Sequence, residues 1–507
     1  MKVDYIIIQA GGEGTRLGYL TQNRPKAIVP INNRPIIFHL FERFPKAKFV
    51  IIGDYKFDVL QAYLENFADV SYVLVHAQGE GNACGVKEAL DYLPENSPFM
   101  LIWSDLLLDK RLCFDGLREK CYIGTTDRFK CSWRYKAGNL EKVSTEDKGV
   151  GGFFLFNDKA LLEGLPETGS FTRWLANSSL EYGSLDMLDS RETGSLEAIK
   201  VIDHSNKNRC RPYNKMIFEN DKVIKEGLTR EGKKLIEREV AWYKAVSKYQ
   251  FNCIPSIHSY DPLVMSRIKG DNIFRGRFTN EQKRQIIDRV VDSLNTLHHL
   301  ERGSSNVFDI QEDYYTKTLK RIRGIRNVLP FNNQPYIRIN GMECKNIFFF
   351  YDEFQKMINI LLKEKTEFGI IHGDSTLTNT MVDDSGNIYF IDARGYFGKT
   401  PLVGDVYYDW AKLYYSIEGA FDQFNIKEFE LHISDDEIQY QINPSGWEQF
   451  TQYFLQKIPD CDVFRIKMIH AVIWLSLASH CWEDYDSMCL AFYNGLYLWN
   501  DLMQEGL

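Results

Sequence analysis

A glycine-rich loop followed by two cations stands directly after the first apolar run of the chain. The loop reads Gln9-Ala10-Gly11-Gly12-Glu13-Gly14-Thr15-Arg16-Leu17, and Lys26 comes soon after it. Glycines let backbone N–H groups come close to a phosphate chain, and they adopt dihedral angles that other residues avoid. Arg16 adds a planar guanidinium, and Lys26 adds a second positive charge. The loop lacks the Gly-Lys-Ser/Thr ending of a P-loop and the third glycine of a dinucleotide fingerprint, so neither of those sites is indicated.

A second group of residues with a shared chemistry lies nearer the end of the chain. Asp374 follows His372-Gly373, Asn379 comes after it, and Asp392 follows the apolar run 388–391. In kinases one aspartate accepts the proton of the attacking hydroxyl, while an asparagine and a second aspartate hold Mg²⁺ on ATP. A turn at 383–387 would return Asp392 to the side of the loop. The pattern therefore predicts phosphoryl transfer at these residues.

The elements around the glycine loop alternate between short apolar runs and helical patterns. We predict strands at 5–8, 49–52, 71–76 and 99–103, and helices at 35–44, 57–67 and 83–93. Continuous apolar strands between helices indicate a parallel sheet with both faces covered. Such sheets bind ligands in the loops beyond the carboxyl ends of their strands.

The pattern changes after this region. Short strands are predicted at 121–124, 131–135, 152–156 and 196–202, and the polar segment 203–209 has no periodicity. We place a boundary there, which gives domains at 1–205 and 210–507. The second domain begins with a predicted hairpin at 215–225, a helix at 231–247, a strand at 263–268 and a helix at 280–300. Most of the last 200 residues read as helical, interrupted by a loop and strand pair at 372–391.

Composition sets limits on the class of protein. The chain has 507 residues, a mass of 59.1 kDa and a net charge of −8, with 44% hydrophobic and 26% charged residues. This length predicts two or three domains. The acidic balance argues against a nucleic-acid partner, and no apolar stretch approaches a membrane span. The ten cysteines contain no CxxC pair, so we expect reduced thiols and a cytoplasmic location.

The longer string around the glycine loop resembles the signature of nucleotidyltransferases that activate sugar phosphates or phosphocholine. It runs through Ala10–Leu17, Arg24-Pro25-Lys26-Ala27-Ile28-Val29-Pro30 and Arg34-Pro35-Ile36. The resemblance covers about residues 1–205 and departs at Tyr19, where the family usually has proline. It implies a Rossmann-like, GT-A-like α/β domain. It also implies that Arg16 stabilises the leaving pyrophosphate and that Lys26 stabilises the attacking phosphate.

The same resemblance implies the remaining residues of this site. The nucleotide-binding residues would be Ala10, Gly11, Gly12, Gly14, Thr15, Gln78 and Gly81. Asp105 matches the first Mg²⁺-binding aspartate, and Asp203 stands where the second is expected. Hard Mg²⁺ prefers carboxylates together with substrate phosphates, which agrees with two aspartates.

The second group of residues resembles the choline kinase and aminoglycoside phosphotransferase superfamily. The resemblance covers about residues 210–507 and implies a bilobal, protein-kinase-like α+β domain. Asp374 would be the catalytic base, with Asn379 and Asp392 as metal ligands. Lys225 would bind the ATP phosphates and pair with Glu239, with Glu237 as the rival partner. The hairpin before Lys225 carries no glycine-rich loop, and Arg394 brings a cation close to the predicted metal site.

Two groups of residues in the second domain have less specific interpretations. The basic run Lys317, Lys320, Arg321, Arg323 and Arg326 is interpreted as a solvated helix face, with binding of an anion, including an acidic substrate, as the alternative. Trp410, Trp474, Trp482 and Trp499 are interpreted as helix packing, with a cage for a choline-type cation as the alternative.

Together these patterns predict a bifunctional, Mg²⁺-dependent enzyme. The second domain would phosphorylate a small hydroxyl compound of the choline or ethanolamine type with ATP. The first would transfer CMP from CTP, or the nucleotidyl group of another NTP, to the phosphorylated product and release pyrophosphate. A CDP-activated precursor of a surface polysaccharide would result. Two alternatives stay open: a sugar or polyol kinase that supplies a nucleotide sugar, and a regulatory pseudoenzyme in one domain. The hydroxyl compound, the NTP base and homo-oligomer formation also stay open.

Overall fold

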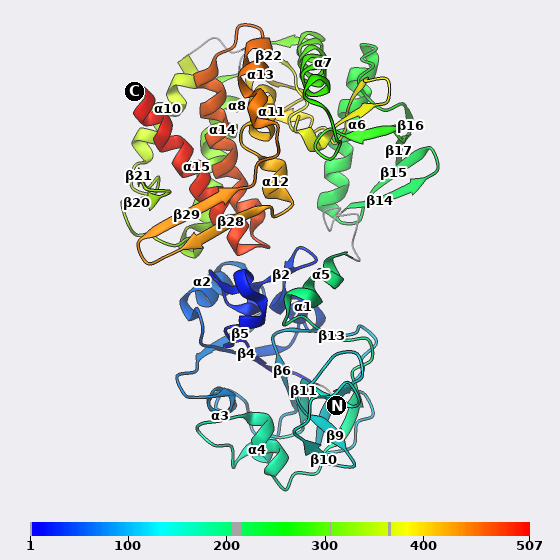
Figure 1. Ribbon diagram of the computed structural model, residues 1–507, viewed down its shortest axis with the longest axis vertical. Coiled ribbons are helices and arrows are strands. Elements are labelled where there is room, and N and C mark those ends of the chain that lie inside the picture. The colour runs from blue at the N-terminus through cyan, green and yellow to red at the C-terminus, as the bar shows by residue number, and fades with distance from the viewer. Residues whose placement is uncertain (1–2, 205–213, 305, 364–366, 507) are drawn as a thin grey trace. The chain divides into compact units, whose positions relative to one another are not determined.

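The computed structural model describes residues 3–204, 214–304, 306–363 and 367–506 (Figure 1). The chain divides into two compact units, the first comprising Met1–Lys207 with Trp482–Asp486 and the second comprising Asn208–Cys481 with Ser487–Leu507. Most of the polar segment in which the sequence places a boundary, from residue 205 on, lies outside the described residues.

The first unit is built on a mixed sheet with the order β10-β9-β11-β6-β1-β4-β5. Its strands are β1 (Tyr5–Gln9), β4 (Lys48–Gly53), β5 (Ser71–His76), β6 (Phe99–Trp103), β9 (Arg134–Lys136), β10 (Asn139–Glu141) and β11 (Gly149–Phe156). The four strands β6, β1, β4 and β5 are parallel, as the sequence predicts, and β11 joins β6 in the antiparallel direction. Two more strands, β8 (Cys121–Thr126) and β12 (Gly183–Asp186), extend the sheet beyond β11.

Burial on both faces explains why the central strands are apolar without alternation. Ile6, Ile7 and Ile8 of β1 have no exposed surface. Helices α1 (Ile36–Arg43), α2 (Phe57–Phe67), α3 (Asn82–Leu90) and α4 (Phe171–Asn177) accompany the sheet. Val86 and Ala89 of α3 and Leu175 of α4 belong to the same core cluster as Ile7 and Leu101. The central strands are therefore fixed in place by a buried apolar core.

The predicted strand at 196–202 is wrong, because these residues form helix α5 (Leu196–His204). The β-branched side chains favour a strand, but the buried residues recur at helical spacing. Ile199 and Ile202 are 6% and 5% exposed and pack with Leu17, Val29, Ile31 and Ile36, whereas Val201 between them is 67% exposed. Packing of one helical face therefore outweighs local β propensity.

The second unit begins with an antiparallel sheet in the order β14-β15-β17-β16. Its strands are β14 (Asn214–Glu219), β15 (Lys222–Gly227), β16 (Ile257–Tyr260) and β17 (Leu263–Ser266), and helix α6 (Arg230–Lys248) follows the hairpin. Three-stranded sheets form from β18 (Gly270–Asn272), β23 (Thr380–Asp383) and β24 (Ile388–Phe390), and from β19 (Arg302–Gly303), β22 (Phe368–Ile370) and β27 (Val403–Asp405).

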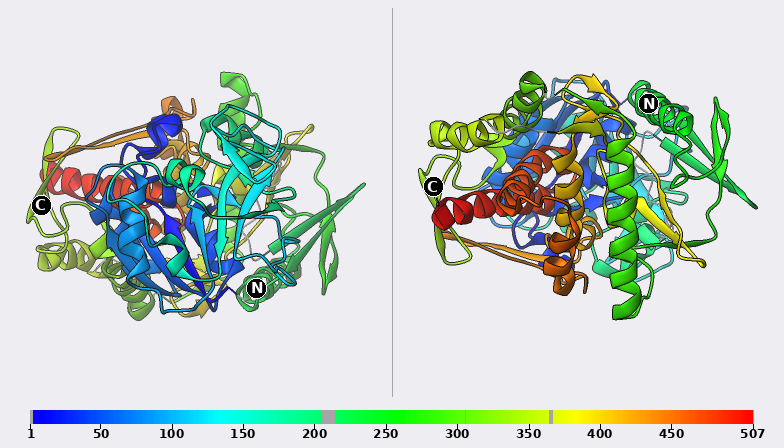
Figure 2. Two further views of the ribbon diagram at one scale, coloured as in Figure 1. Left: turned by 90° about the horizontal axis from the view of Figure 1, so that it is seen from below. Right: turned by 90° about the horizontal axis from the view of Figure 1, so that it is seen from above.

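The remainder of this unit is mainly helical. The longer helices are α7 (Asn280–His299), α9 (Lys317–Ile325), α10 (Tyr351–Lys363), α11 (Val406–Ile417), α14 (Val463–Ala478) and α15 (Tyr485–Gly506). Helices α14 and α15 lie side by side (Figures 1 and 2), and Gly495 allows this, since a Cβ there would lie 2.6 Å from the backbone nitrogen of Leu475. In the described part of the chain, no helix combines the length and apolar character that a bilayer crossing requires.

The prediction of mainly helical structure after residue 300 missed several strands, including a whole four-stranded sheet. Strands β20 (Tyr336–Ile339), β21 (Met342–Lys345), β28 (Phe429–Ile433) and β29 (Glu437–Ile442) form it in the order β21-β20-β29-β28. It joins two hairpins that lie almost 100 residues apart in the sequence, through the parallel pairing of β20 with β29. The pairing of such distant hairpins depends on the tertiary structure and cannot be read from either segment alone.

The burial pattern of α5 predicts different costs for neighbouring substitutions. Ile199→Ala removes a buried side chain and should lower the free energy of unfolding of the first unit by about 2–4 kcal/mol. Val201→Ala, on the exposed face, should change it by less than about 0.5 kcal/mol. Urea unfolding of the two variants measures the difference, and equal costs would contradict the helical placement.

Candidate functional site

A cavity of about 430 Å³ opens at the carboxyl ends of the parallel strands in the first unit. Gln9 ends β1, Asp54 follows β4 and Trp103 ends β6, and the strand register sets Gln9 beside Ile52 and Trp103. The other residues that line the cavity are Gly11, Gly12, Arg16, Lys26, Ala77, Gly79, Gly81, Asn82, Gly85, Ser104, Asp105 and Glu192. The cavity therefore gathers the loops that the sequence expects at this edge.

Six of the residues predicted for this site line the cavity: Gly11, Gly12, Arg16, Lys26, Gly81 and Asp105. Ala10, Gly14, Thr15 and Gln78, which were also predicted, are not part of this lining. Ala10 is 1% exposed, and Gly14 takes a left-handed conformation with φ of 71° at the start of the helical turn Thr15–Thr21. Gly14 thus shapes the loop.

The cations of the site are held by carboxylates. Lys26 Nζ contacts Asp105 Oδ2, and Arg16 Nη2 donates to Glu192 Oε1 at 2.6 Å. The Arg16 side chain is 64% exposed, so the guanidinium remains accessible to a ligand, whereas the Asp105 side chain is 4% exposed. A ligand phosphate entering here would meet two cations whose positions the protein already fixes.

Gly194 marks the point where the two carboxylates and Arg16 converge. A Cβ at Gly194 would lie 2.5 Å from Glu192 Oε1, 2.7 Å from Asp105 Oδ2 and 2.9 Å from Arg16 Nη2. Thr193 fixes the strand beside Asp105, since its backbone N–H and its hydroxyl both donate to the Asp105 carbonyl at 2.8 Å. Only a residue without a side chain leaves room at this position for an ion or a phosphate oxygen.

Sequence reasoning missed Glu192. It lies in β13 (Arg191–Glu192), which pairs with β7 (Leu106–Leu107) directly after Asp105. The signal in the sequence was weak, because a two-residue strand inside a polar stretch has no periodicity. Asp203, which the resemblance implied as the second Mg²⁺-binding aspartate, lies near the end of α5. Its side chain is outside the described residues.

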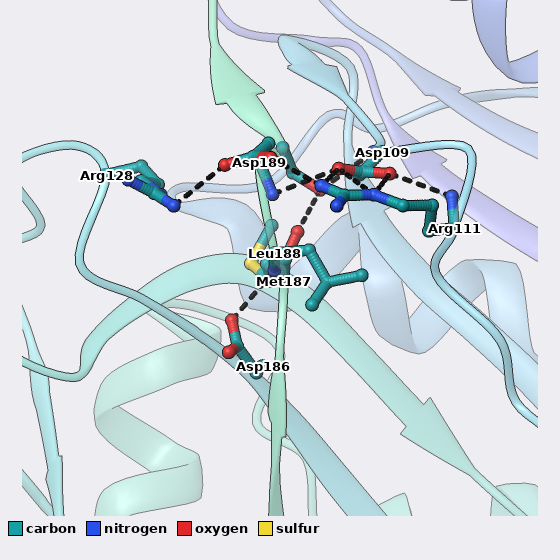
Figure 3. Close-up of polar contacts among 8 residues, drawn as sticks. Asp109, Arg111, Arg128, Asp186, Met187, Leu188 and Asp189 are labelled. Atoms are coloured by element: carbon teal, nitrogen blue, oxygen red, sulfur yellow. Dashed lines mark hydrogen bonds and ion pairs between the residues drawn. The ribbon is translucent and has the colours of Figure 1, made fainter.

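A polar clamp holds the segment that leads to Glu192 (Figure 3). The Asp189 backbone N–H donates to Asp109 Oδ2 at 3.2 Å, and the Asp109 N–H donates to Ser190 Oγ at 2.9 Å. Arg111 pairs with Asp109 at 2.6 Å and also contacts Asp189. Hydrogen bonds from Arg111 hold the pKa of the Asp109 carboxyl well below its usual range. The clamp ties the loop after β7 to the residues just before Glu192, and so limits where that carboxylate can lie.

The other end of the cavity presents amides and close backbone. Asn82 Nδ2 donates to Gln9 Oε1 at 3.1 Å, and the backbone N–H of Phe171 donates to Asn82 Oδ1 at 2.8 Å. A Cβ at Gly81 would lie 2.3 Å from the carbonyl oxygen of Gly169, so this loop packs directly on its neighbour. This end of the cavity therefore offers amide groups whose orientation is fixed by hydrogen bonds.

In the second unit a buried lysine joins three elements. Lys225 of β15 pairs with Glu239 of α6 at 2.6 Å and contacts Asp392, which follows β24. The rival partner Glu237 lies on an exposed part of the same helix. Burial raises the pKa of Glu239 to about 7. Burial disfavours the charge on Lys225, but Asp392 and Glu239 outweigh it and raise the lysine pKa above its ordinary value.

The predicted base and metal ligands lie next to one another. Asn379 Nδ2 donates to Asp374 Oδ2 at 3.0 Å, and the N–H of Ile391 donates to the Asn379 carbonyl at 3.0 Å. That second bond sets Asp392 beside the loop. Asp392 has φ of 59°, a left-handed conformation that aspartate adopts more readily than most residues. Backbone strain of this kind gathers at functional sites.

Asp409 of α11 fixes the loop that carries Asp374. It accepts hydrogen bonds from the backbone N–H groups of His372 at 2.8 Å and Gly373 at 2.7 Å, and its carbonyl accepts from Ser375 Oγ at 2.9 Å. His298 Nε2 lies 3.1 Å from the same carboxylate. The fully buried Asp409 is therefore a positioning residue for the loop.

Sequence reasoning also missed Lys412. It lies one helical turn after Asp409, and its Nζ pairs with Asp374 Oδ1 at 3.0 Å. Burial disfavours its charge, but Asp374 outweighs this and raises the pKa of Lys412. The lysine had no motif to mark it, because the contact depends on how α11 packs against the loop.

Known proteins match the N-terminal part of the chain. The family described as MobA-like NTP transferase domain matches residues 6–121. The bifunctional protein GlmU of Methanocaldococcus jannaschii is 31% identical over 108 residues, which is 21% of this chain and 26% of that protein. A mannose-1-phosphate guanyltransferase of Kluyveromyces lactis is 35% identical over 111 residues, which is 20% of this chain and 31% of that protein.

Among solved structures, the CTP:phosphocholine cytidylyltransferase of Streptococcus pneumoniae aligns with a TM-score of 0.34 and 19% identity, over 41% of this chain and 100% of that one. The matched region spans about a quarter to a third of the length of the two curated relatives. Because the family model matches residues 6–121, the chain has an N-terminal MobA-like NTP transferase domain.

The raised pKa of Glu239 predicts a pH-dependent stability. A raised carboxyl pKa contributes stability below the unfolded value of 4.5, and this contribution is lost as the pH rises through about 7. The unfolding free energy of the wild type should thus fall relative to that of Glu239→Gln between about pH 5 and about pH 8. Urea unfolding of the wild type and of Glu239→Gln at several pH values in this range measures this difference in unfolding free energy. Glu237→Gln, on the exposed face of α6, should follow the wild type, and a flat difference for Glu239→Gln would contradict the assignment.

Proposed function

We propose that the chain is a bifunctional enzyme that makes a nucleotide-activated compound in two steps. The second unit phosphorylates a small hydroxyl compound with ATP, and the first unit transfers a nucleotidyl group to the phosphorylated product. In the first instance this group is CMP from CTP, and the activated product serves as a precursor of a surface polysaccharide. The observation that carries the proposal is the convergence of Lys26, Arg16, Asp105 and Glu192 on one cavity at the sheet edge.

Support for the transfer step comes from the charges of that cavity. The reaction joins an acceptor phosphate oxygen to the α-phosphorus of an NTP and breaks the bond to pyrophosphate. This requires in-line positioning and neutralisation of charge more than it requires a protein nucleophile. Arg16 is placed to stabilise the leaving pyrophosphate, and Lys26 is placed to bind the attacking phosphate. The activities in the names of the matched relatives, uridylyl and guanylyl transfer to sugar phosphates among them, are of this reaction type.

The donor set of the cavity fits a hard divalent cation such as Mg²⁺. Among the described residues, Asp105 Oδ1 is buried without a hydrogen-bond partner, and Glu192 meets Asp105 at Gly194. We propose that Asp105 and Glu192 hold the ion, in place of the predicted pair of Asp105 and Asp203. When bound, Mg²⁺ would neutralise phosphate charge. Arg16 and Lys26 would orient the substrate phosphates around the ion.

In the second unit the proposed base is Asp374. It accepts the proton as the acceptor hydroxyl oxygen bonds to the γ-phosphorus and the bond to ADP breaks. Asn379 and Lys412 hold the two carboxylate oxygens, so the base is oriented before the substrate arrives. Lys225 supplies charge for the ATP phosphates, and Asn379 and Asp392 would hold Mg²⁺. The bilobal kinase-like fold belongs to this proposal, supported by the sheet and helix α6 that precede a larger helical part.

One observation argues against a quaternary amine as the acceptor, and so favours the alternative that the sequence left open. A choline cage needs aromatic faces open to the substrate. Trp410, Trp474 and Trp499 are 4%, 0% and 0% exposed and are used in packing, for example by Trp410 against His298. Trp482 is half-buried, belongs to the first unit and packs against Phe38 and Phe67. These rings are therefore not available as walls of a cation site.

Substitution of Gly194 tests the first site without removing any functional group. Gly194→Ala places a methyl group among Asp105, Glu192 and Arg16, and should lower the rate of pyrophosphate release about 100-fold or more while the fold is kept. The matched control is Gly164→Ala, where a Cβ would lie 3.9 Å from its nearest neighbour. A pyrophosphate assay with each of the four NTPs measures both variants. Wild-type rates for Gly194→Ala would contradict the proposed convergence.

Separate variants test whether both units are active. Asp374→Ala should abolish ATP-dependent phosphorylation and leave pyrophosphate release from a supplied phosphorylated acceptor unchanged, and Lys26→Ala should do the reverse. Mass spectrometry of the products formed from ATP, CTP and a metabolite extract measures both steps. If either variant keeps the reaction assigned to its unit, that assignment is wrong, and a unit without activity in the wild type would be regulatory.

A further inference from the structure

A group of four cations lies beside Asp374, and only Lys412 among them has a role in the proposed chemistry. It consists of Lys317 and Arg321 in α9, Arg394 after Asp392, and Lys412 in α11, and we name it the cation cluster. The Arg394, Lys412 and Lys317 side chains are 19%, 13% and 20% exposed, so each is largely withdrawn from water while retaining some access to it. The basic run that begins at Lys317 was predicted to be a solvated helix face, and this prediction is wrong for Lys317 and Arg321, which are only partly exposed.

The contacts of the cluster form a continuous path that reaches the proposed base. Lys412 pairs with Asp374 at 3.0 Å, and Arg394 Nη1 donates to Tyr408 Oη at 2.7 Å. Tyr408 and Lys412 stand four residues apart in α11, so they lie on the same face of the helix and connect the two contacts. The cluster therefore lies within reach of a small molecule whose hydroxyl contacts Asp374.

A widened helical turn supplies the carboxylate that faces the cluster. Gln311–Thr316 is π-helical, and it carries Asp313 and Tyr314. Asp313 lies 3.4 Å from Arg394 and contacts Lys317. Inserted π turns often occur at functional sites because they redirect side chains. Here the turn directs one carboxylate toward two cations.

The cluster holds more positive than negative charge. Its four cations face two carboxylates, Asp313 and Asp374, and Asp374 is needed for the reaction. Among the described residues, Arg321 has no carboxylate partner and donates only to Ser476. Burial, followed by repulsion from Arg394, lowers the pKa of Lys317 to about 7. Buried positive charge without a matching anion is costly, and a bound anion would relieve that cost.

We propose that the hydroxyl compound phosphorylated by the second unit is an anion, a small alcohol that bears a carboxylate or a phosphate, and that Lys317, Arg321 and Arg394 bind its negative group while its hydroxyl contacts Asp374. This inference rests on the proposed kinase function and narrows its substrate class. It excludes choline and ethanolamine, because the same four cations would repel a positively charged acceptor.

A series of acceptors that differ in charge tests the substrate class. Purified full-length protein is incubated with ATP and Mg²⁺ and, in separate reactions, glycolate, glycerate, glycerol 3-phosphate, ethylene glycol, glycerol, ethanolamine and choline. A further reaction contains a metabolite extract. Mass spectrometry identifies the phosphorylated product. We expect turnover of an anionic alcohol, and comparison of glycerate with glycerol 3-phosphate distinguishes a carboxylate from a phosphate. Phosphorylation of neutral or cationic alcohols only would overturn the inference alone, whereas no phosphorylation of any compound would overturn the kinase assignment as well.

Variants of α9 test whether the cluster binds the acceptor or ATP. Arg321→Gln and Lys317→Gln should each raise the KM for the anionic acceptor about 10- to 100-fold and leave the KM for ATP unchanged. The matched control is Lys320→Gln, an exposed lysine of the same helix, which should behave as the wild type. A raised KM for ATP, or an unchanged KM for the acceptor in both variants, would overturn the proposal. Circular dichroism of the variants distinguishes loss of binding from loss of fold.

Discussion

Charge removed from water has to be paired, and this constraint governs both units. In the first unit Lys26 lies against Asp105, and in the second Lys225 lies between Glu239 and Asp392. In each case the partners come from segments that are distant in the sequence, so the pair can form only when the surrounding elements are in place. The lysines are withdrawn from water before any ligand arrives. A substrate phosphate that binds either lysine therefore enters a site in which the lysine side chain is already ordered.

The scaffold supplies this pairing in two different ways. The first unit uses the parallel sheet, whose strands deliver Gln9, Asp54 and Trp103 to a common edge. The second unit uses a single buried carboxylate, that of Asp409. It accepts hydrogen bonds from the backbone N–H groups of His372 and Gly373 and so orients the loop that carries Asp374. The first arrangement is a property of strand direction, while the second depends on one side chain. Loss of Asp409 would leave two backbone donors without partners in a buried position.

Local patterns were enough to predict most elements of the first sheet. The apolar runs that became β1, β4, β5 and β6 indicated parallel strands, which the structure has, and residues of the glycine loop lie with Lys26 and Asp105 at their carboxyl ends. The failures share a physical cause. The helix α5 was taken for a strand because the burial of Ile199 and Ile202 depends on partners elsewhere in the chain. Glu192 and Lys412 were missed for the same reason, since each acquires its role from a neighbour more than 30 residues away.

The π turn at Gln311–Thr316 has a consequence for how acceptor preference could change over time. A π turn contains one residue more than the α-helix it interrupts, so it can arise or disappear through a single codon insertion or deletion. Removal of that residue would rotate everything after it by about 100°, the angle between successive residues of an α-helix. Lys317 and Arg321 would turn away from Arg394 together, and the exposed side of α9 would take their place. One small genetic event could therefore exchange a whole binding surface while the residues that act on ATP stay where they are.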